Sequence, residues 1–395
     1  MTWWEINSVD WALMGGVLLL FVAQVYWYSR YMAAPARRLK GKNRNGAIST
    51  QPSEDPHLPG VSVILSAHNE GANLADYLPA LLSQDYPQYE VIVVDDGSED
   101  NTHDIVEQWM LQSKRLRTTF VPKGARVGST KKLALTLGAK AAQYEILLLT
   151  DADCVPESDQ WIRQMVRPLQ ASPAEEGVGI VLGYGAYFQE NSHVSRLVCY
   201  DTLFNGLHYL GAALCGHPYM GVGRNLAYRK ELFFDSGGFT RLMTNRAGDD
   251  DLFVNHVANR ANTSVVLSRE SYTYSPGKQT LREWLQQKRR HLSVSPAYRA
   301  ETKWRLVAEP LSRGLFYAAV IATIVCSVRT SHLIPLFVAL GLFMVRWIMQ
   351  TLILNVSARR MGQKPFLMAS VLWFDITLPL VNLWMLAVPQ RNRKW

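Results

Sequence analysis

Apolar runs that are uninterrupted, or nearly so, occupy four stretches of the chain, one near its start and three near its end. They cover residues 11–29, 311–328, 333–356 and 366–388. Each run is long enough to cross the hydrocarbon core of a membrane as a helix. The pattern therefore predicts an integral membrane protein with one N-terminal span and two or three C-terminal spans.

Basic residues cluster directly after the first apolar run, and no acidic residue occurs between Asp10 and Glu54. Lysine and arginine next to a span remain on the cytoplasmic side. A signal peptide fits poorly, because Glu5 and Asp10 rather than basic residues precede the run. We therefore expect a protein of the plasma (inner) membrane, with its N-terminus outside and the domain after the first span in the cytoplasm.

Charged residues inside the C-terminal runs leave the topology there open. Arg346 lies in the middle of the run 333–356, where it should face other helices or line a channel. Asp375 and Pro379 lie inside the last run, so this segment either crosses the membrane or re-enters it. If all three runs cross, the basic tail 391–395 lies outside, against the usual charge bias.

The region after the first apolar run alternates strand-like and helix-like patterns. Strand-like runs cover residues 61–67, 90–96, 117–122 and 144–150, and helical spacing covers residues 71–84, 101–111 and 131–142. This alternation predicts an α/β fold with a mostly parallel, doubly wound sheet. Ligands bind such sheets beyond the carboxyl ends of the strands.

These patterns divide the chain into five parts. We expect a transmembrane anchor at 1–30, a basic and polar linker at 31–60, and the α/β domain at 61–269. An interfacial amphipathic region follows at 270–310, and a C-terminal transmembrane region covers 311–395.

The net charge of the 395-residue chain is +8. Its basic residues gather beside the membrane segments, where they attract anionic lipids, so membrane lipids are an expected partner. No nucleic-acid-binding motif accompanies this charge, and nucleic acid is not an expected partner. The four cysteines show neither paired nor metal-binding spacing, which favours reduced thiols. Protein partners are not predicted.

Acidic residues end or follow three of the strand-like runs. Asp151 and Asp153 come after the fourth run, where two carboxylates can hold Mg²⁺ or Mn²⁺ together with substrate phosphates. An acidic turn is the alternative. Asp95 and Asp96 end the second run and either bind a nucleotide base or ribose or form a turn, and Glu70 follows the first run.

Three further stretches carry candidate chemistry. Lys131 begins a helical pattern, either as a solvated residue or as a cation aimed at a phosphate. Three consecutive aspartates in 247–255 either begin a helix or include a general base with a raised pKa. The glycines of 221–239 are typical either of a close backbone approach or of two tight turns around a short strand. Neither a Walker A loop nor a dinucleotide fingerprint is present in the sequence.

A helix is predicted to begin at a capping box formed by Thr280 and Glu283. Gln287, Arg290 and His291 lie together on this helix. The helix is either a basic amphipathic helix on the membrane surface or a binding face for a phosphate-rich group, and both readings can hold together.

Taken in order, the segments SAHNE, VVDDGS, STKKLAL, LTDADC, GDDDL and QKRRH resemble the membrane-bound, inverting glycosyltransferases of family 2. That family includes cellulose, chitin and hyaluronan synthases and bacterial polysaccharide glycosyltransferases. The resemblance covers residues 61–291 and implies a GT-A fold, Mn²⁺ or Mg²⁺ as cofactor, and a nucleotide-sugar donor, expected to be a UDP sugar. It also implies transfer of a hexose or N-acetylhexosamine to a lipid-linked or saccharide acceptor.

The resemblance implies roles for the positions that match. Asp151 and Asp153 match the D-x-D motif that binds the metal and the donor diphosphate. Asp250 matches the catalytic base, with Asp249 as the alternative if the register shifts by one. The other matching residues would bind the nucleotide sugar together with Asp151; they are Glu70, Asp95, Asp96, Lys131, Gln287, Arg290 and His291.

His291 stands where the family often has a tryptophan that touches the acceptor sugar. This difference favours transfer of single sugars over processive synthesis with coupled export, although a histidine can also stack on a sugar. A non-catalytic membrane scaffold and a transporter are alternatives from other classes. The scaffold is disfavoured because every acid of the motifs is present, and the transporter because the spans are few.

Overall fold

The structure, a computed structural model, describes residues 6–44, 58–122, 124–125, 127–170, 177–243 and 247–388. The basic tail 391–395 and residues 45–57 of the expected linker lie outside this range. The chain forms two compact units. The membrane unit combines Met1–Ala36 with Arg299–Trp395, and the sheet unit is Arg37–Tyr298.

A seven-stranded sheet forms the centre of the sheet unit, in the order β3-β2-β1-β4-β8-β6-β9. The strands are β3 (Leu116–Phe120), β2 (Tyr89–Asp95), β1 (Val61–Ala67), β4 (Ile146–Leu149), β8 (Leu226–Arg229), β6 (Ile180–Leu182) and β9 (Thr263–Val265). The first four are parallel to one another, whereas β8 runs antiparallel to both β4 and β6. The predicted α/β fold with a mostly parallel sheet is confirmed, and β8 is the antiparallel exception.

The core of this unit explains why its strands read as apolar runs. Val63 of β1 lies opposite Val91 of β2 and Leu148 of β4, and all three side chains are fully buried. A parallel strand covered by helices on both faces has no polar side, so its sequence does not alternate. Helix α5 approaches so closely that a Cβ on Gly138 would lie 2.5 Å from Ile64 Cγ2.

Eight α-helices accompany the sheets within the described part of this unit, apart from the larger, C-terminal part of α2. They are α3 (Gly71–Leu82), α4 (Thr102–Gln112), α5 (Thr130–Ala141), α6 (Trp161–Gln170), α7 (His193–Leu214), α8 (Lys230–Asp235), α9 (Asp251–Val257) and α10 (Leu281–Leu292). The short 3-10 turns are η2 (Gly223–Asn225), η3 (Thr240–Leu242), η4 (Arg269–Ser271) and η5 (Ser295–Ala297). The predicted capping box of Thr280 and Glu283 is present and starts α10.

A second, smaller sheet has three strands, in the order β5-β10-β7. They are β5 (Val155–Pro156), β10 (Thr273–Ser275) and β7 (Gly185–Tyr187). Strand β5 follows Asp151 and Asp153 directly in the chain, so this sheet begins beside the end of β4. It therefore brings residues of the later chain next to that strand end.

Four helices of the membrane unit are long and apolar enough to cross a membrane. The first consists of α1 (Ser8–Trp27) and its π-helical continuation η1 (Tyr28–Met32), and the others are α11 (Ala300–Thr330), α12 (Leu333–Arg360) and α13 (Met368–Ala387). Helix α2 (Ala34–Arg44) then occupies part of the segment 31–60, which we had expected to be a linker.

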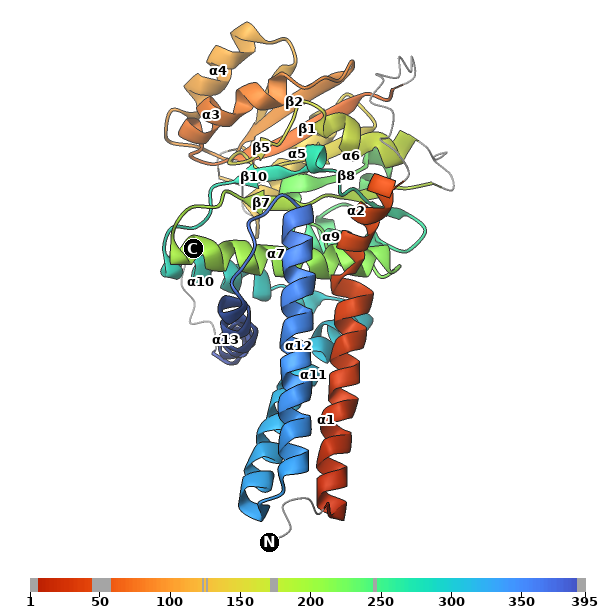
Figure 1. Ribbon diagram of the computed structural model, residues 1–395. Helices are drawn as coiled ribbons and strands as arrows, with labels where there is room; N and C mark the ends of the chain where they lie inside the picture. Colours follow the sequence, from red (N-terminus) through yellow and green to blue (C-terminus); the bar gives the residue numbers. More distant parts are fainter. Residues whose placement is uncertain are drawn as a thin grey trace. The chain divides into compact units, whose positions relative to one another are not determined.

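Helices α1, α11 and α12 run side by side along their length in Figure 1, whereas α13 is seen almost end-on and so runs across them. Helix α13 continues without a break through Asp375 and Pro379. The outer faces of these helices expose large apolar side chains, among them Leu19 and Leu380. Exposed leucine on a long helix suits a lipid environment.

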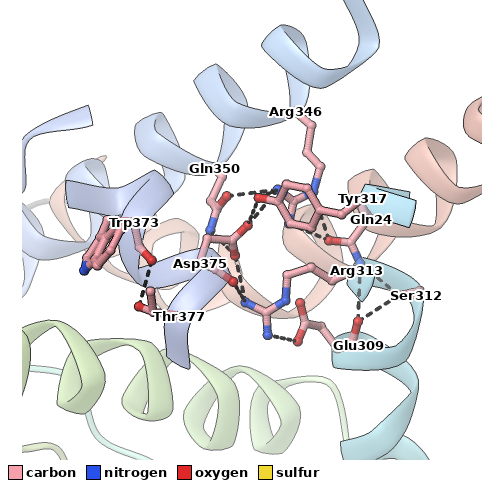
Figure 2. Close-up of polar contacts among 10 residues, drawn as sticks. All are labelled: Gln24, Glu309, Ser312, Arg313, Tyr317, Arg346, Gln350, Trp373, Asp375 and Thr377. Carbon is pink, nitrogen blue, oxygen red and sulfur yellow. Dashed lines mark hydrogen bonds and ion pairs between the residues drawn. The ribbon is translucent and has the colours of Figure 1, made fainter. Parts of the chain in front are cut away.

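A buried polar cluster, the membrane network, joins α1, α11, α12 and α13 (Figure 2). Asp375 of α13 is its centre. Its Oδ1 accepts hydrogen bonds from Arg313 Nη1 at 2.7 Å and from Gln350 Nε2 at 2.8 Å. Its Oδ2 accepts from the Tyr317 hydroxyl at 2.6 Å and from Arg346 Nη1 at 2.9 Å.

The remaining contacts of the membrane network balance its charges. Arg346 donates to Gln24 Oε1 through Nη2 at 2.9 Å, and Arg313 donates to Glu309 Oε2 at 2.9 Å. Two arginines therefore face two carboxylates. Arg346 is 1% exposed, so it faces other helices and not lipid, as a charge within an apolar span requires. This expectation for Arg346 is confirmed.

Candidate active site

The carboxyl ends of β1, β2 and β4 carry the acidic residues singled out in the sequence. These strands are adjacent and parallel, so their ends meet at one edge of the sheet. Glu70 follows β1, Asp95 and Asp96 lie at the end of β2, and Asp151 and Asp153 follow β4. Tertiary structure thus gathers on one edge groups that are up to 83 residues apart in the chain, from 70 to 153.

Asp151 and Asp153 present a donor set that fits a hard divalent cation. Ligand atoms of Asp151, Asp153 and Cys154 all lie within 4.8 Å of one another. Burial first, and the neighbouring acids second, raise the pKa of the Cys154 thiol, and a thiol is a soft ligand that hard divalent cations do not favour. The two carboxylates remain, and oxygen ligands of this kind suit Mg²⁺ or Mn²⁺.

The two carboxylates differ in charge environment. Burial opposes ionisation of Asp151, but Lys131, whose Nζ lies 2.8 Å from Asp151 Oδ1, outweighs it and lowers the pKa. Asp153 has no such partner, and burial together with the charge of Asp151 raises its pKa. A cation bound between them would favour the ionised form of both.

Lys131 connects this pair to a second acidic pair. Its Nζ also lies 3.5 Å from Asp249 Oδ2, although Asp249 is 98 residues after Asp151 in the chain. Burial lowers the pKa of Lys131, but these acids outweigh the burial and raise it. The side chain of Lys131 is 42% exposed, so the group is open to solvent and accessible to a ligand.

Asp250 is the N-cap of α9, and its carboxylate is held by backbone N–H groups. Oδ2 accepts from Gly223 at 2.5 Å, and Oδ1 accepts from Asp251 at 2.8 Å. Burial, and then the charge of Asp249, raise the pKa of Asp250 to about 6 against the lowering effect of Lys131. The helix-start reading therefore holds, since Asp250 caps α9, and a pKa of about 6 is one that would suit a general base.

Lys132 does not share the position of Lys131, although the two are consecutive. The Lys132 side chain is fully buried, and its Nζ donates to the backbone carbonyl groups of Leu242 at 3.0 Å and Ala247 at 2.8 Å. These carbonyls belong to the chain just before Asp249. Lys131 therefore faces the acids, while Lys132 supports the segment that presents them.

The expected nucleotide-binding acids near β1 and β2 occupy turn positions. Asp95 Oδ1 accepts the backbone N–H of Ser98 at 2.9 Å, so the turn reading holds there. Burial raises the pKa of Asp96. Burial also raises the pKa of Glu70, with Asp153 and Asp151 adding to the effect, which places Glu70 in electrostatic range of that pair.

Helix α10 carries the expected residues Gln287, Arg290 and His291. Gln287 Nε2 donates to the Tyr187 hydroxyl at 2.7 Å. The charge of Arg290 lowers the pKa of Asp151, which places Arg290 in electrostatic range of the D-x-D pair. Desolvation and then Arg290 lower the pKa of His291, and its exposure to solvent weakens this shift.

Sequence reasoning did not single out three residues that the structure adds: Gly223, Arg224 and Tyr187. A Cβ on Gly223 would lie 3.3 Å from Asp250 Oδ2, so this glycine permits the close approach of the backbone to the carboxylate. The glycines of 221–239 were the available signal for Gly223. The turn reading of that stretch also holds, because Gly237 and Gly238 have φ values of +82° and +53°.

Residues 18–395 match the sequence profile described as Glycosyl transferase family 21. Poly-beta-1,6-N-acetyl-D-glucosamine synthase of Staphylococcus epidermidis is 36% identical over 107 residues, which are 27% of this chain and 25% of that protein. Glycosyltransferase AglE of Haloferax volcanii is 35% identical over 128 residues, which are 32% of this chain and 39% of that protein. The matches thus span well under half the length of either relative.

Among solved structures, mannosyltransferase PcManGT from Pyrobaculum calidifontis, in complex with GDP-Man and Mn²⁺, has a similar fold. The comparison covers 87% of this chain and 99% of that chain, with a TM-score of 0.51 and 20% sequence identity. The GT-A fold and the glycosyltransferase class expected from the sequence are confirmed. The matching family is family 21, whereas the motifs had been compared with family 2.

Proposed function

The chain belongs to glycosyl transferase family 21, and on that basis we propose that it transfers a sugar with inversion from a nucleotide sugar to a lipid-linked or saccharide acceptor. The donor is a UDP sugar carrying a hexose or N-acetylhexosamine, and Mn²⁺ or Mg²⁺ is the cofactor. The reaction takes place at the cytoplasmic face of the plasma (inner) membrane.

One observation carries the proposal: Lys131 lies between two acidic pairs that come from distant parts of the chain. Its Nζ is 2.8 Å from Asp151 and 3.5 Å from Asp249, and Asp250 follows directly. A glycosyl transfer needs a site for the leaving diphosphate and a base for the acceptor hydroxyl, close to each other. The D-x-D pair suits the first role and Asp250 suits the second.

Asp151 and Asp153 would hold the metal ion. When bound, the ion would neutralise negative charge on the diphosphate leaving group. Lys131 and Arg290 would supply positive charge to the same region and so stabilise the leaving diphosphate. Glu70, Asp95 and Asp96 would contact the nucleoside portion at the ends of β1 and β2.

Asp250 would act as the general base. Its Oδ atoms accept two backbone N–H groups, which fix the carboxylate, and its pKa of about 6 leaves it ionised but basic at pH 7. It would take the proton of the acceptor hydroxyl as that oxygen bonds to the anomeric carbon. The bond from that carbon to the diphosphate breaks in the same displacement, which inverts the configuration.

The four apolar helices support a membrane-bound acceptor. A lipid-linked acceptor would keep its apolar part in the bilayer and present its polar end to a domain at the surface. The basic residues after the first span support a cytoplasmic position for that domain. Helix α10, with Gln287, Arg290 and His291, would cover the donor.

The test is the release of nucleoside diphosphate by the full-length protein purified in detergent. UDP and GDP sugars would be supplied with Mn²⁺ or Mg²⁺, with and without EDTA and a lipid extract. We expect release from one donor class, dependence on the metal, and loss on Asp250→Asn. Asp104→Asn, an exposed acid on α4, is the matched control and should keep full activity.

Four outcomes would each contradict a part of the proposal. Equal release by wild type and Asp250→Asn would exclude Asp250 as the base. No release with any donor or lipid fraction, from folded protein that binds UDP, would favour a non-catalytic scaffold. Retention of the anomeric configuration in the product would contradict inversion, and long saccharide products would favour processive synthesis.

A further inference from the structure

Arg224 is a charged residue of the sheet unit to which neither the sequence motifs nor the proposed function assigns a role. It lies in η2, between Gly223, which holds Asp250, and the start of β8. Its guanidinium stacks over the ring of Tyr187, with Cζ 4.2 Å from the ring centroid. Its Nη1 is 3.4 Å from Ser275 Oγ, a long hydrogen bond, and its Nε is buried without a hydrogen-bond partner.

The position of this side chain is built into the small sheet. A Cβ on Gly185 of β7 would lie only 2.4 Å from Arg224 Nε and 2.7 Å from its Cγ and Cδ, so glycine leaves the space that the arginine fills. The backbone carbonyl of Arg224 accepts from Thr273 Oγ1 at 3.0 Å. The guanidinium is therefore held in place before any ligand binds.

The next residue makes the backbone rigid. Asn225 is fully buried and donates to the carbonyl groups of Tyr184 at 2.9 Å and Ser271 at 2.7 Å. Its Oδ1 accepts from Trp161 Nε1 at 3.0 Å. Each polar atom of the Asn225 side chain is thus satisfied, so this network fixes η2 and with it the direction of Arg224.

Arg224 lies beside the D-x-D pair and is linked to α10. Thr150, the residue before Asp151, donates through its hydroxyl to the backbone carbonyl of Arg224 at 3.3 Å. The positive charge of Arg224 also favours the ionised forms of Asp151 and Asp153. Tyr187, beneath the guanidinium, accepts a hydrogen bond from Gln287 at 2.7 Å. Arg224 and Tyr187 therefore link the end of β4 to α10.

Arg224 differs from the arginines that stabilise the fold. Arg313 and Arg346 each pair with a carboxylate, and Arg117 pairs with Glu90 at 2.7 Å. Arg224 has no such ion pair with any carboxylate in the described part of the chain. A half-buried arginine that pairs with no described carboxylate suits a bound anion, and its planar fork matches phosphate oxygens.

We propose that Arg224, stacked on Tyr187, binds the diphosphate of the nucleotide-sugar donor and stabilises it as it leaves. Tyr187 is a positioning residue that fixes the plane of the guanidinium and ties it to Gln287. The inference rests on the proposed function, because the donor supplies the diphosphate. It adds a cation from η2 to those that the sequence motifs supply, Lys131 and Arg290.

The test compares nucleoside, nucleoside monophosphate and nucleoside diphosphate binding by calorimetry. Full-length protein in detergent would be titrated with uridine, UMP and UDP, and with the guanosine series, each with Mn²⁺. Arg224→Met should weaken nucleoside diphosphate binding by about tenfold to a hundredfold, the effect of losing charge-assisted hydrogen bonds. Nucleoside affinity should change less than about twofold. Arg224→Lys should fall in between, because it keeps the charge but not the planar fork.

Arg115→Met is the matched control. Arg115 also stacks on a tyrosine, with Cζ 4.4 Å from the ring centroid of Tyr89, but it lies before β3 and not at the ends of β1, β2 and β4. Its substitution should leave the affinity for every nucleotide unchanged. If Arg224→Met does not fold, Gly185→Ala carries the test, because its Cβ displaces the guanidinium and should cause the same selective loss.

Three outcomes overturn the inference. The first is wild-type affinity of Arg224→Met for the diphosphate. The second is an equal loss for nucleoside, monophosphate and diphosphate, which indicates a structural role. The third is an effect confined to the acceptor's KM. If wild type itself binds neither UDP nor GDP with Mn²⁺, both the proposed donor and this inference are wrong. If wild type binds and only the variants lose affinity, the result concerns the role of Arg224 alone.

Discussion

Two clusters of charged side chains, one in each unit, differ in how their charges are compensated. In the membrane network, Glu309 pairs with Arg313, and Asp375 receives four hydrogen bonds from Arg313, Arg346, Tyr317 and Gln350. Two carboxylates thus meet two arginines. In the active-site cluster, acids exceed bases, since Asp151 and Asp249 share Lys131 as their ion-pair partner. Asp153 and Asp250 add two further carboxylates, and neither forms an ion pair within the described residues.

The difference follows from the surroundings of each cluster. The membrane network is almost fully buried among apolar helices, where an unpaired charge is costly, so every charge has its partner. The active-site cluster is partly open, with the Asp151 and Lys131 side chains 35% and 42% exposed, and water tolerates the excess charge until a cation arrives. Imbalance of charge, more than the number of charged residues, therefore marks the ligand site.

The largest effect is expected for the general base. Asp250→Asn keeps the shape and the hydrogen bond from Gly223 but cannot take a proton, so kcat should fall about 10²- to 10⁴-fold. Binding of nucleoside diphosphate with Mn²⁺ should be retained. Steady-state rates and calorimetric affinities of the same preparation check this, and a loss of binding in proportion to rate would contradict a role in proton transfer.

The next effect concerns the metal. Asp151→Asn and Asp153→Asn each remove one of the two carboxylates that would share the ion, so Mn²⁺ should no longer raise the affinity for nucleoside diphosphate. The melting temperature of wild type should rise on addition of Mn²⁺ because the ion binds the folded state, and both variants should lack the rise. A rise of wild-type size in either variant would place the metal elsewhere.

Replacing one acid in each cluster shows how much each acid contributes to the free energy of unfolding. Asp375→Asn leaves two buried arginines facing one carboxylate and should cost about 3–5 kcal/mol of unfolding free energy. Asp153→Asn removes a charge that the folded state disfavours, and stability without metal should stay within about 1 kcal/mol of wild type. Unfolding in mixed detergent measures both. Equal losses would mean that the two clusters do not differ as we infer.

The smallest effect is a shift in pH dependence. The folded pKa of Asp250 is raised to about 6, so kcat/KM should rise with pH through about 6 as the base ionises. Asp249→Asn removes a charge that raises this pKa, so the acid limb should move to lower pH. Because the folded pKa is above the unfolded one, stability from Asp250 is full below about pH 4 and is lost as pH rises through 6. An unmoved limb would contradict coupling of the two acids.

Much of the fold could be predicted from the sequence because its signals are local. Apolar length indicated the four long helices, and unbroken apolar runs indicated β1, β2 and β4. Thr280 and Glu283 indicated the start of α10. One reading of residues 221–239 included a short strand where β8 lies, but its antiparallel direction was not anticipated, since that depends on its pairing with β4 and β6 and no local pattern records it.

By itself the sequence determined which chemical groups this protein possesses and in which segments they occur: the acids after β1, β2 and β4, the aspartates before α9, and the charges inside the apolar runs. Only the tertiary structure decided which of them meet. It separated Lys131 from Lys132 and paired Arg346 with Asp375. It also left Arg224 without an ion pair to any carboxylate in the described part of the chain. The reason is physical, because charge compensation depends on distances between segments far apart in the chain, which no stretch of sequence specifies alone.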